Sequence, residues 1–247
     1  MGTSLRFRGG GRGGPLLLLL HGLGATGDVW ARWAEPLERA WPGRWIAPDL
    51  PGHGGSAPLP EYTFDAFAEA VRPLLTPDDR TVVLGHSLGG VVALTLAARA
   101  PVAAVVGLGV KVAWTEEELA RAKALSQRPV AWFATREEAI ARHLRVSGLD
   151  GLVAVDDPAA TEGVREEQGR WRLALDPGAF AVGAPDMPGL LTRSTAAVRL
   201  ARGEQDPMNT DDQLERLGAP VVTLAGLGHN AHVQDPARCL SLLEAYR

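Results

Sequence analysis

Short apolar runs alternate with amphipathic segments along most of the chain. Runs without polar alternation, such as the leucines at 16–20, are typical of strands buried on both faces of a parallel sheet. This alternation of strand and helix predicts an α/β fold with a mostly parallel, doubly wound sheet. The predicted strands are 16–20, 44–47, 81–84, 103–108, 197–201 and 221–225, with 5–8 as a candidate antiparallel edge strand, and the predicted helices are 28–40, 64–75, 88–100, 210–217 and 236–246.

Residues 112–190, called the inserted segment below, break this alternation and show only helical and loop signals. Thr115 and Glu118 form a capping-box pattern that opens a helix, and 136–145 predicts another. The segment lies between two predicted strands, so we expect it to cover the strand ends where open α/β sheets bind ligands. The sequence therefore predicts a core of residues 1–111 and 191–247 and a helical cap of residues 112–190.

Composition limits the kind of partner. The 247 residues carry a formal net charge of −4 and no basic run, which argues against a nucleic-acid surface. The single cysteine, Cys239, excludes an intrachain disulfide, and its helical surroundings predict a small core residue. We expect a small-molecule substrate and no cofactor.

The N-terminal region imitates several targeting and binding motifs. Arginines precede the leucine run as in a signal peptide, but that run is shorter than the roughly 7–15 residues such a segment needs. The glycines at 9–14 satisfy G-x-G-x-x-G but precede a strand, so we expect a flexible turn and no dinucleotide site. No apolar stretch is long enough to span a bilayer, and a cytoplasmic protein is the expectation.

The most informative motif is Gly85-His86-Ser87-Leu88-Gly89, which stands between a predicted strand and a predicted helix. In a nucleophile elbow of this form, the serine hydroxyl projects above the sheet edge, and the next N–H, that of Leu88, can stabilise an oxyanion. The glycines allow close approach of strand and helix. The alternative is a serine that caps an ordinary helix.

Candidate partners for Ser87 follow the later strands. Asp206 follows strand 197–201 and is the preferred acid, while Glu204, Asp211 and Asp212 are alternatives. His229 follows the last strand on a glycine-flanked loop and is the candidate base. His232 is its competitor, with an expected structural role, and His86 is expected to pack, because adjacent strand residues point to opposite faces. The order Ser, Asp, His is that of the α/β-hydrolase triad.

With these motifs in order, the chain resembles a capped serine hydrolase or esterase of the α/β-hydrolase fold. The resemblance also rests on His21-Gly22-Leu23-Gly24, on residues 49–56 and on Gly203-Glu204-Gln205-Asp206. It implies Ser87 as nucleophile, Asp206 as acid, His229 as base, and the N–H groups of Leu23 and Leu88 as oxyanion hole.

The implied reaction is hydrolysis of a small carboxylic ester through an acyl-enzyme. The same triad also serves carbon–carbon bond hydrolases, lactonases, thioesterases, aminopeptidases and perhydrolases. A ligand receptor without catalytic activity is the alternative outside the enzymes. A metal site at His229 and His232 is disfavoured, because the H-E-x-x-H pattern is absent. Lys111, just after strand 103–108, either contacts a polar substrate or is exposed at the hinge of the cap, and exposure is the preferred interpretation. The tryptophans that either line a substrate pocket or hold the fold together are Trp30, Trp114, Trp132 and Trp171.

Overall fold

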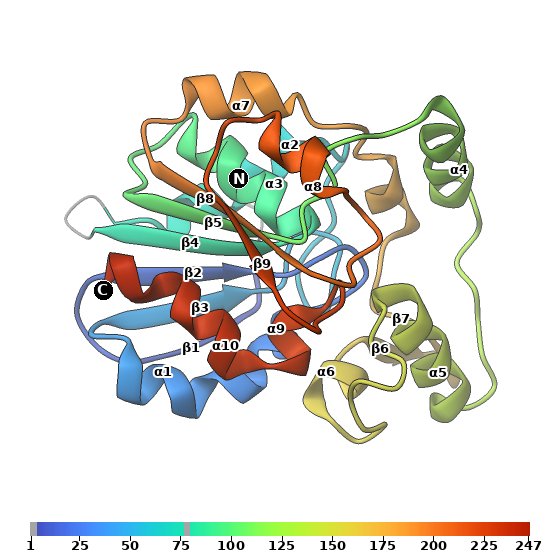
Figure 1. Ribbon diagram of the computed structural model, residues 1–247. Coiled ribbons are helices and arrows are strands. Elements are labelled where there is room, and N and C mark those ends of the chain that lie inside the picture. The colour runs from blue at the N-terminus through green and yellow to red at the C-terminus, as the bar shows by residue number, and fades with distance from the viewer. Residues whose placement is uncertain (1–3, 77–79) are drawn as a thin grey trace.

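A seven-stranded sheet forms the centre of the computed structural model, which describes residues 4–76 and 80–247 (Figure 1). The strand order is β1-β3-β2-β4-β5-β8-β9. Every neighbouring pair is parallel except β1 and β3, which are antiparallel. The strands are β1 (Phe7–Gly10), β2 (Leu16–Leu20), β3 (Arg44–Pro48), β4 (Thr81–His86), β5 (Ala104–Leu108), β8 (Ala197–Gly203) and β9 (Val221–Leu224).

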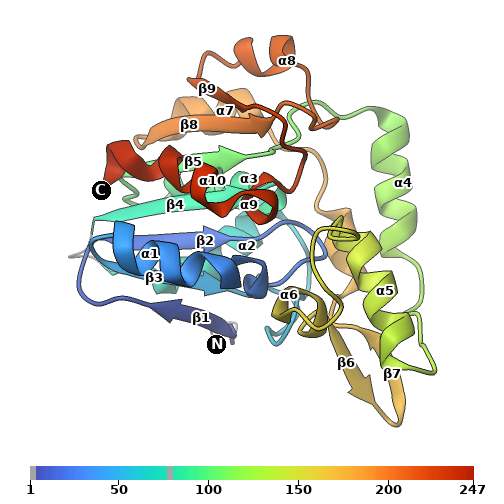
Figure 2. The same ribbon diagram turned by 60° about the horizontal axis from the view of Figure 1, so that its bottom comes forward.

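Helices cover both faces of this sheet (Figure 2). The leucines of β2 are all fully buried, and because successive strand side chains point to opposite faces, they divide between two cores. Leu17 and Leu19 pack with η1 and α1, whereas Leu18 and Leu20 pack with α2 and α3. The first face is covered by η1 (Gly27–Trp33), α1 (Ala34–Ala40), α9 (Ala231–Gln234), α10 (Pro236–Leu240) and η4 (Ser241–Tyr246), and the second by α2 (Phe64–Val71), η2 (Arg72–Leu74), α3 (Leu88–Ala97) and α7 (Met187–Arg193), with α8 (Asp211–Glu215) next to β9.

The predicted α/β fold is confirmed, with local differences. The edge strand lies at Phe7–Gly10, so two of the glycines expected in a turn pair with β3 instead. The helix predicted at 28–40 is divided into a 3₁₀ turn and an α-helix. Pro36 has no N–H to donate, so an unbroken helix could not make its bond back to Arg32.

The inserted segment contains a β-hairpin as well as helices, which corrects the expectation of helices and loops alone. Strands β6 (Val164–Glu167) and β7 (Arg170–Leu173) pair antiparallel across Gln168 and Gly169, both at positive φ. Positive φ at both central residues is the geometry of a tight hairpin turn. The other elements are α4 (Glu116–Ser126), α5 (Arg136–Ser147), α6 (Pro158–Thr161) and η3 (Pro177–Ala181).

The inserted segment lies beyond the carboxyl ends of the parallel strands as far as η3, whereas its last residues belong to α7 and lie against the sheet (Figure 2). The boundary expected at residue 190 falls inside α7, whose Met187 and Leu190 are buried in the core beside α3. Cys239 is buried, as expected. Within the described ranges, no helix combines the length and apolar character that crossing a membrane requires.

Candidate active site

Ser87 occupies a strained turn between β4 and α3. Its backbone has φ 50° and ψ −115°, a conformation that costs energy for any residue with a Cβ. A Cβ on Gly85 would lie 2.2 Å from the carbonyl oxygen of Gly89, so only glycine permits the tight approach. Ser87 stands at the N-cap position, but its hydroxyl makes no capping hydrogen bond. The ordinary helix cap therefore does not account for this serine.

An acid–base pair follows β8 and β9. Asp206 Oδ2 accepts a hydrogen bond from His229 Nδ1 over 3.0 Å, and the carboxylate is fully buried while the imidazole is 21% exposed. The bond fixes the proton on Nδ1, which leaves Nε2 free to accept a proton. Of the acids considered from the sequence, Asp206 is the one that contacts His229.

The competing acids make contacts with residues other than His229. Glu204 accepts a hydrogen bond from the Gly226 N–H, and Asp211 pairs with Arg202. In Asp206 itself, the carboxylate oxygen that does not contact His229, Oδ1, accepts a hydrogen bond from the Met208 N–H at 2.9 Å. Asp212 lies in the first turn of α8, where acids favour the helix dipole.

Asn209 ties this turn to the end of β5, a role that the sequence did not signal. Its side-chain amide donates to the Val110 carbonyl at 2.6 Å, and its side-chain oxygen accepts from the Val112 N–H at 2.9 Å. These bonds join segments about a hundred residues apart, so no local pattern could have revealed them.

Gly109 brings Ser87 and the acid–base pair to one place. The Ser87 N–H donates to the Leu108 carbonyl at 2.8 Å, which fixes the elbow to the end of β5. At the next residue, a Cβ on Gly109 would lie 3.2 Å from Asp206 Oδ2 and from His229 Nδ1. Among the described residues, no hydrogen bond joins the Ser87 hydroxyl to His229, a contact that often tightens only when substrate binds.

Buried aromatic rings pack next to His229. The ring of His86 lies 4.7 Å from that of His229 and 4.2 Å from that of His232, and His232 in turn packs on Trp30. His86 Nε2 donates to the His229 carbonyl at 3.0 Å. Burial lowers the pKa of His232 to about 3 and that of His86 well below its usual value, so both rings are neutral. Both have the packing roles expected of them.

The two N–H groups implied as an oxyanion hole belong to segments next to Ser87, because Leu88 follows it directly and a Cβ on Gly22 would lie 3.4 Å from the Ser87 Cβ. Leu88 is the first residue of α3, so its N–H lacks an intrahelical partner. Leu23 lies in the turn after β2, where His21 accepts from the Leu50 N–H and donates to the Gly22 carbonyl. Within the described residues, neither the Leu23 nor the Leu88 N–H has a protein acceptor.

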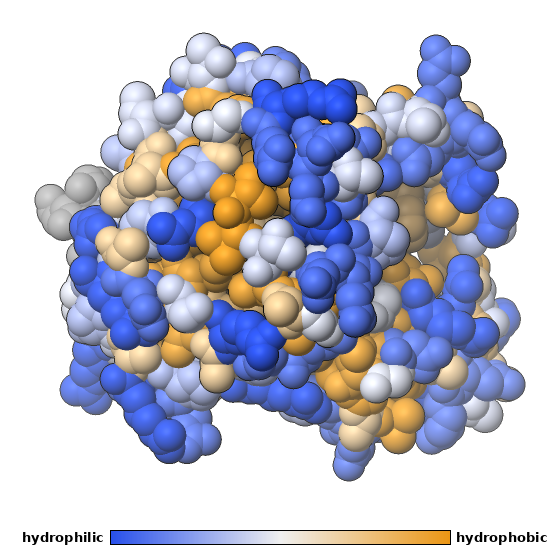
Figure 3. Space-filling model, viewed as in Figure 1, coloured by the Kyte–Doolittle hydropathy of each residue, from blue (hydrophilic) through white to orange (hydrophobic). Residues whose placement is uncertain are grey.

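A cavity of about 590 Å³ lies between α4, the η3 region and Leu23, and its described lining does not include Ser87, Asp206 or His229. Leu23, Lys111, Trp114, Phe180 and Met208 contribute to its lining. In Figure 3 hydrophobic side chains line a hollow next to α4. Lys111 is only 18% exposed and pairs with Glu118 at 2.9 Å, which corrects the expectation of an exposed hinge lysine.

The other candidate tryptophans lie away from this cavity. Trp30 is fully buried against Trp33 and His232. Trp132 is flanked by Arg170 and Arg172, and Trp171 by Arg136. None of the three is among the residues that line the cavity, and Trp132 is 37% exposed. In the described part of the chain, no group of three His, Cys, Asp or Glu residues is placed to hold a metal ion.

Comparison with known proteins gives matches at the level of family and fold. The model of the "Alpha/beta hydrolase family" matches residues 17–242. The crystal structure of E-2-(acetamidomethylene)succinate hydrolase aligns with a TM-score of 0.81 at 24% identity, covering 99% of this chain and 95% of that one. A thioesterase domain from the curacin biosynthetic pathway aligns with a TM-score of 0.81 at 22% identity, covering 98% and 95%.

Curated relatives match over shorter segments. The magnesium-chelatase 30 kDa subunit of Rhodobacter capsulatus is 43% identical over 102 residues, which are 38% of this chain and 34% of that protein. The pimeloyl-[acyl-carrier protein] methyl ester esterase of Aromatoleum aromaticum is 47% identical over 87 residues, which are 35% of this chain and 33% of that protein. These matches span about a third of each relative's length. Because the family model covers nearly all of the described sheet and helices, the chain belongs to the α/β hydrolase family.

Proposed function

We propose that this protein hydrolyses small carboxylic esters through an acyl-enzyme formed on Ser87. The observation that carries the proposal is the strained Ser87 turn fixed beside the hydrogen-bonded pair of Asp206 and His229. Strained backbone conformations cluster at functional sites. A serine, a base and an acid that orients the base are the groups that acyl transfer requires.

In the proposed reaction, His229 Nε2 takes the proton of the Ser87 hydroxyl as the serine oxygen attacks the ester carbonyl. Collapse of the tetrahedral intermediate breaks the bond to the alkoxy oxygen, which receives that proton from His229. Water then gives a proton to His229 and attacks the acyl-enzyme, and the carboxylic acid leaves as Ser87 regains its proton. Asp206 holds the imidazole tautomer and stabilises the imidazolium that forms in each half-reaction.

The negative charge on the carbonyl oxygen would lie between the N–H groups of Leu23 and Leu88. The absence of a protein acceptor for either group within the described chain supports this role. Loss of one such donor typically costs on the order of a hundredfold in rate. The inserted segment would act as the cap that closes this site from water.

The matches to an esterase and to the lipase LipV of Mycobacterium tuberculosis, 43% identical over 108 residues, support ester chemistry over the other bonds that such a triad can cleave. The LipV match covers 42% of this chain and 40% of that protein, so substrate identity is not transferred with it. Thioesters, lactones and amides belong in the same screen as esters.

The test is hydrolysis of a panel of p-nitrophenyl esters by the wild type and by Ser87→Ala. Ser241→Ala, at an exposed serine on the C-terminal 3₁₀ turn, is the matched control. We expect Ser87→Ala to reduce turnover by at least about a thousandfold and Ser241→Ala to leave it unchanged. Turnover retained by Ser87→Ala would overturn the proposal.

A further inference from the structure

Asn230, the residue after the proposed base, bonds to the inserted segment and not to its own helix. It stands at the N-cap position of α9, where an asparagine side chain commonly accepts a hydrogen bond from the first turn. Within the described chain its side chain makes no such bond. Its amide instead donates to the Gly148 carbonyl at 2.9 Å and lies 3.5 Å from the Ser147 carbonyl. This buried contact joins segments 82 residues apart, so helix capping does not account for Asn230.

The last turn of α5 supplies the acceptors for this amide. The final carbonyls of a helix have no partner within the helix, so they need donors from elsewhere. Helix α5 ends at Gly148, which is its C-cap residue and has φ +69°. Ala139, Ile140 and Leu144 bury α5 in the hydrophobic core on the first face of the sheet. The acceptor is therefore itself held in place by the core.

The same turn of α5 also touches the turn that carries Leu23. A Cβ on Gly24, which has φ +81°, would lie 2.9 Å from Val146 Cγ1. Glycine thus lets the turn after β2 lie directly against α5. Residues 146–148 therefore contact two segments of the proposed active site, the Leu23 turn and the His229 loop.

The peptide that joins His229 to Asn230 is held at both ends. His86 Nε2 donates to the His229 carbonyl at 3.0 Å, and the Asn230 side chain makes the bond to α5. Asp206 bonds to Nδ1 of the His229 ring. The Asp206 contact orients the ring, whereas the bonds to the adjacent peptide fix the position from which the ring extends.

We propose that Asn230 is a positioning residue, which uses α5 to hold His229 within reach of Ser87. The inference rests on the proposed function and adds that the inserted segment takes part in the geometry of the active site. Helix α5 then supports the loop of the base as well as covering the strand ends. Misplacement of catalytic groups by about 1 Å can cost a hundredfold in rate, so loss of this contact should lower kcat on the order of tenfold.

Two substitutions break the contact from opposite ends. Asn230→Ala removes the donor, and α9 loses no capping bond with it. Gly148→Ala acts from the inserted segment, because its Cβ would lie 2.9 Å from Asn230 Nδ2. The second substitution leaves Asn230 in place, so it tests the contact even if Asn230→Ala does not fold.

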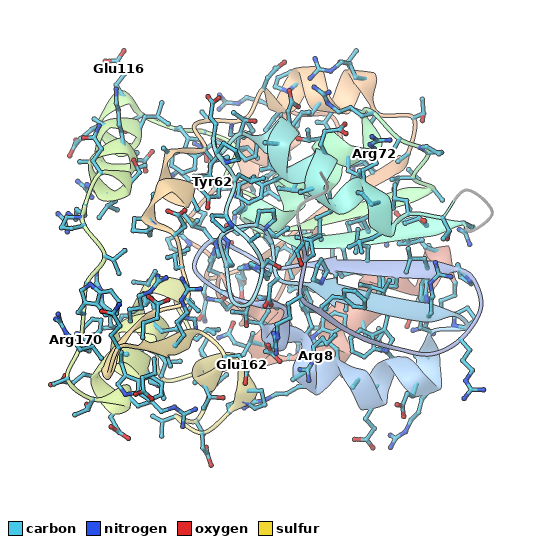
Figure 4. All side chains as sticks on the ribbon, turned by 180° about the vertical axis from the view of Figure 1, so that it is seen from behind. Arg8, Tyr62, Arg72, Glu116, Glu162 and Arg170 are labelled. Carbon is cyan, nitrogen blue, oxygen red and sulfur yellow. The ribbon has the colours of Figure 1, made fainter. Side chains whose placement is uncertain are left out.

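Each substitution has a matched control. Tyr62→Phe removes another hydrogen bond between the core and the inserted segment, from the Tyr62 hydroxyl to Asp176 at 2.9 Å. Tyr62 packs in the core on the opposite face of the sheet from α5, and Figure 4 shows it near the border with the inserted segment. Gly151→Ala is the control for Gly148→Ala, because Gly151 has φ +75° and nothing in the described chain lies within 4 Å of the added Cβ.

The measurements are kcat for p-nitrophenyl acetate and both the rate and the final extent of fluorophosphonate labelling at Ser87. We expect Asn230→Ala and Gly148→Ala to lower kcat and the labelling rate on the order of tenfold, with labelling that still goes to completion. Tyr62→Phe and Gly151→Ala should keep the wild-type rates. Complete labelling separates misplacement of His229 from loss of folded protein, because an unfolded fraction would stay unlabelled.

A rate in Asn230→Ala or Gly148→Ala that equals the rate of its control would overturn the proposal. Slower turnover that is matched by a smaller labelled fraction would overturn it as well, since the role of the contact would then be structural. If the wild type were not labelled at Ser87, the proposed function itself would fail, which is a different result.

Discussion

Gly109→Ala tests whether the geometry of Asp206 and His229 matters separately from the stability of the fold. Gly109 has φ +63°, and a Cβ there would lie 3.2 Å from Asp206 Oδ2 and 3.2 Å from His229 Nδ1. The substitution thus places one methyl group against both members of the hydrogen-bonded pair. The neighbours must move by a few tenths of an ångström to accommodate it.

The structure gives a magnitude for each effect. An alanine in the left-handed region costs about 1–2 kcal/mol in the free energy of unfolding. Displacement of catalytic groups by about 1 Å can cost a hundredfold in rate, so a shift of a few tenths should reduce kcat/KM on the order of tenfold. The two losses are separable, because the stability cost arises from backbone conformation and the rate cost from the acid–base pair.

Gly218→Ala is the matched control. Gly218 has φ +71° and nothing within 4 Å of the added Cβ. Urea denaturation should show a similar loss of stability in both variants, and p-nitrophenyl ester hydrolysis should show a loss of rate only in Gly109→Ala. Unchanged activity in Gly109→Ala, or an equal loss in Gly218→Ala, would refute the reasoning.

Three more predictions concern the elbow, the acid and the buried histidines. Gly85→Ala should lower the free energy of unfolding by about 3 kcal/mol or more, because its Cβ would lie 2.2 Å from backbone; a loss below about 1 kcal/mol in urea denaturation would contradict this. Asp206→Asn should reduce kcat on the order of a thousandfold or more with little change in Tm, since an amide oxygen can still accept from Met208. A kcat near the wild-type value would count against the assigned acid. Burial lowers the pKa of His232 to about 3, whereas a histidine in the unfolded chain has a pKa of roughly 6.5. The contribution of neutral His232 to the free energy of unfolding is therefore complete above about pH 6.5 and is lost as the pH falls toward 3. The test is denaturation at pH values between about 5 and 7. His232→Gln should lower the slope of the free energy of unfolding against pH by up to about 1.4 kcal/mol per pH unit. An unchanged slope would show that His232 does not cause this pH dependence.

The parallel sheet could be predicted because its signal is local. Strands such as β2 and β5 are apolar throughout, since both of their faces are buried. The hairpin β6–β7 escaped prediction because one strand reads Val-Arg-Glu-Glu, in which only Val164 is buried. Its signal was the Gln168–Gly169 pair, in which both residues adopt positive φ.

The candidate site depends on a mixture of local and distant information. Gly85, Ser87 and Gly89 belong to one turn, so the motif alone indicated their geometry. The choice of Asp206 over its neighbours needed the fold, because the contact with His229 joins two different strand ends. The stacking of His86 on His232 joins β4 to α9, and the ion pair of Lys111 depends on where α4 lies. No spacing in the sequence encodes those contacts.

Covalent labelling with a fluorophosphonate tests the role of Ser87 most directly. The purified wild type is incubated with the probe, digested and analysed by mass spectrometry, with Ser87→Ala and Ser241→Ala treated in parallel. The account predicts a single adduct on Ser87 in the wild type and in Ser241→Ala, loss of ester hydrolysis in proportion to labelling, and no adduct in Ser87→Ala. An unlabelled wild type, or an adduct on another residue that accompanies the loss of activity, would contradict it.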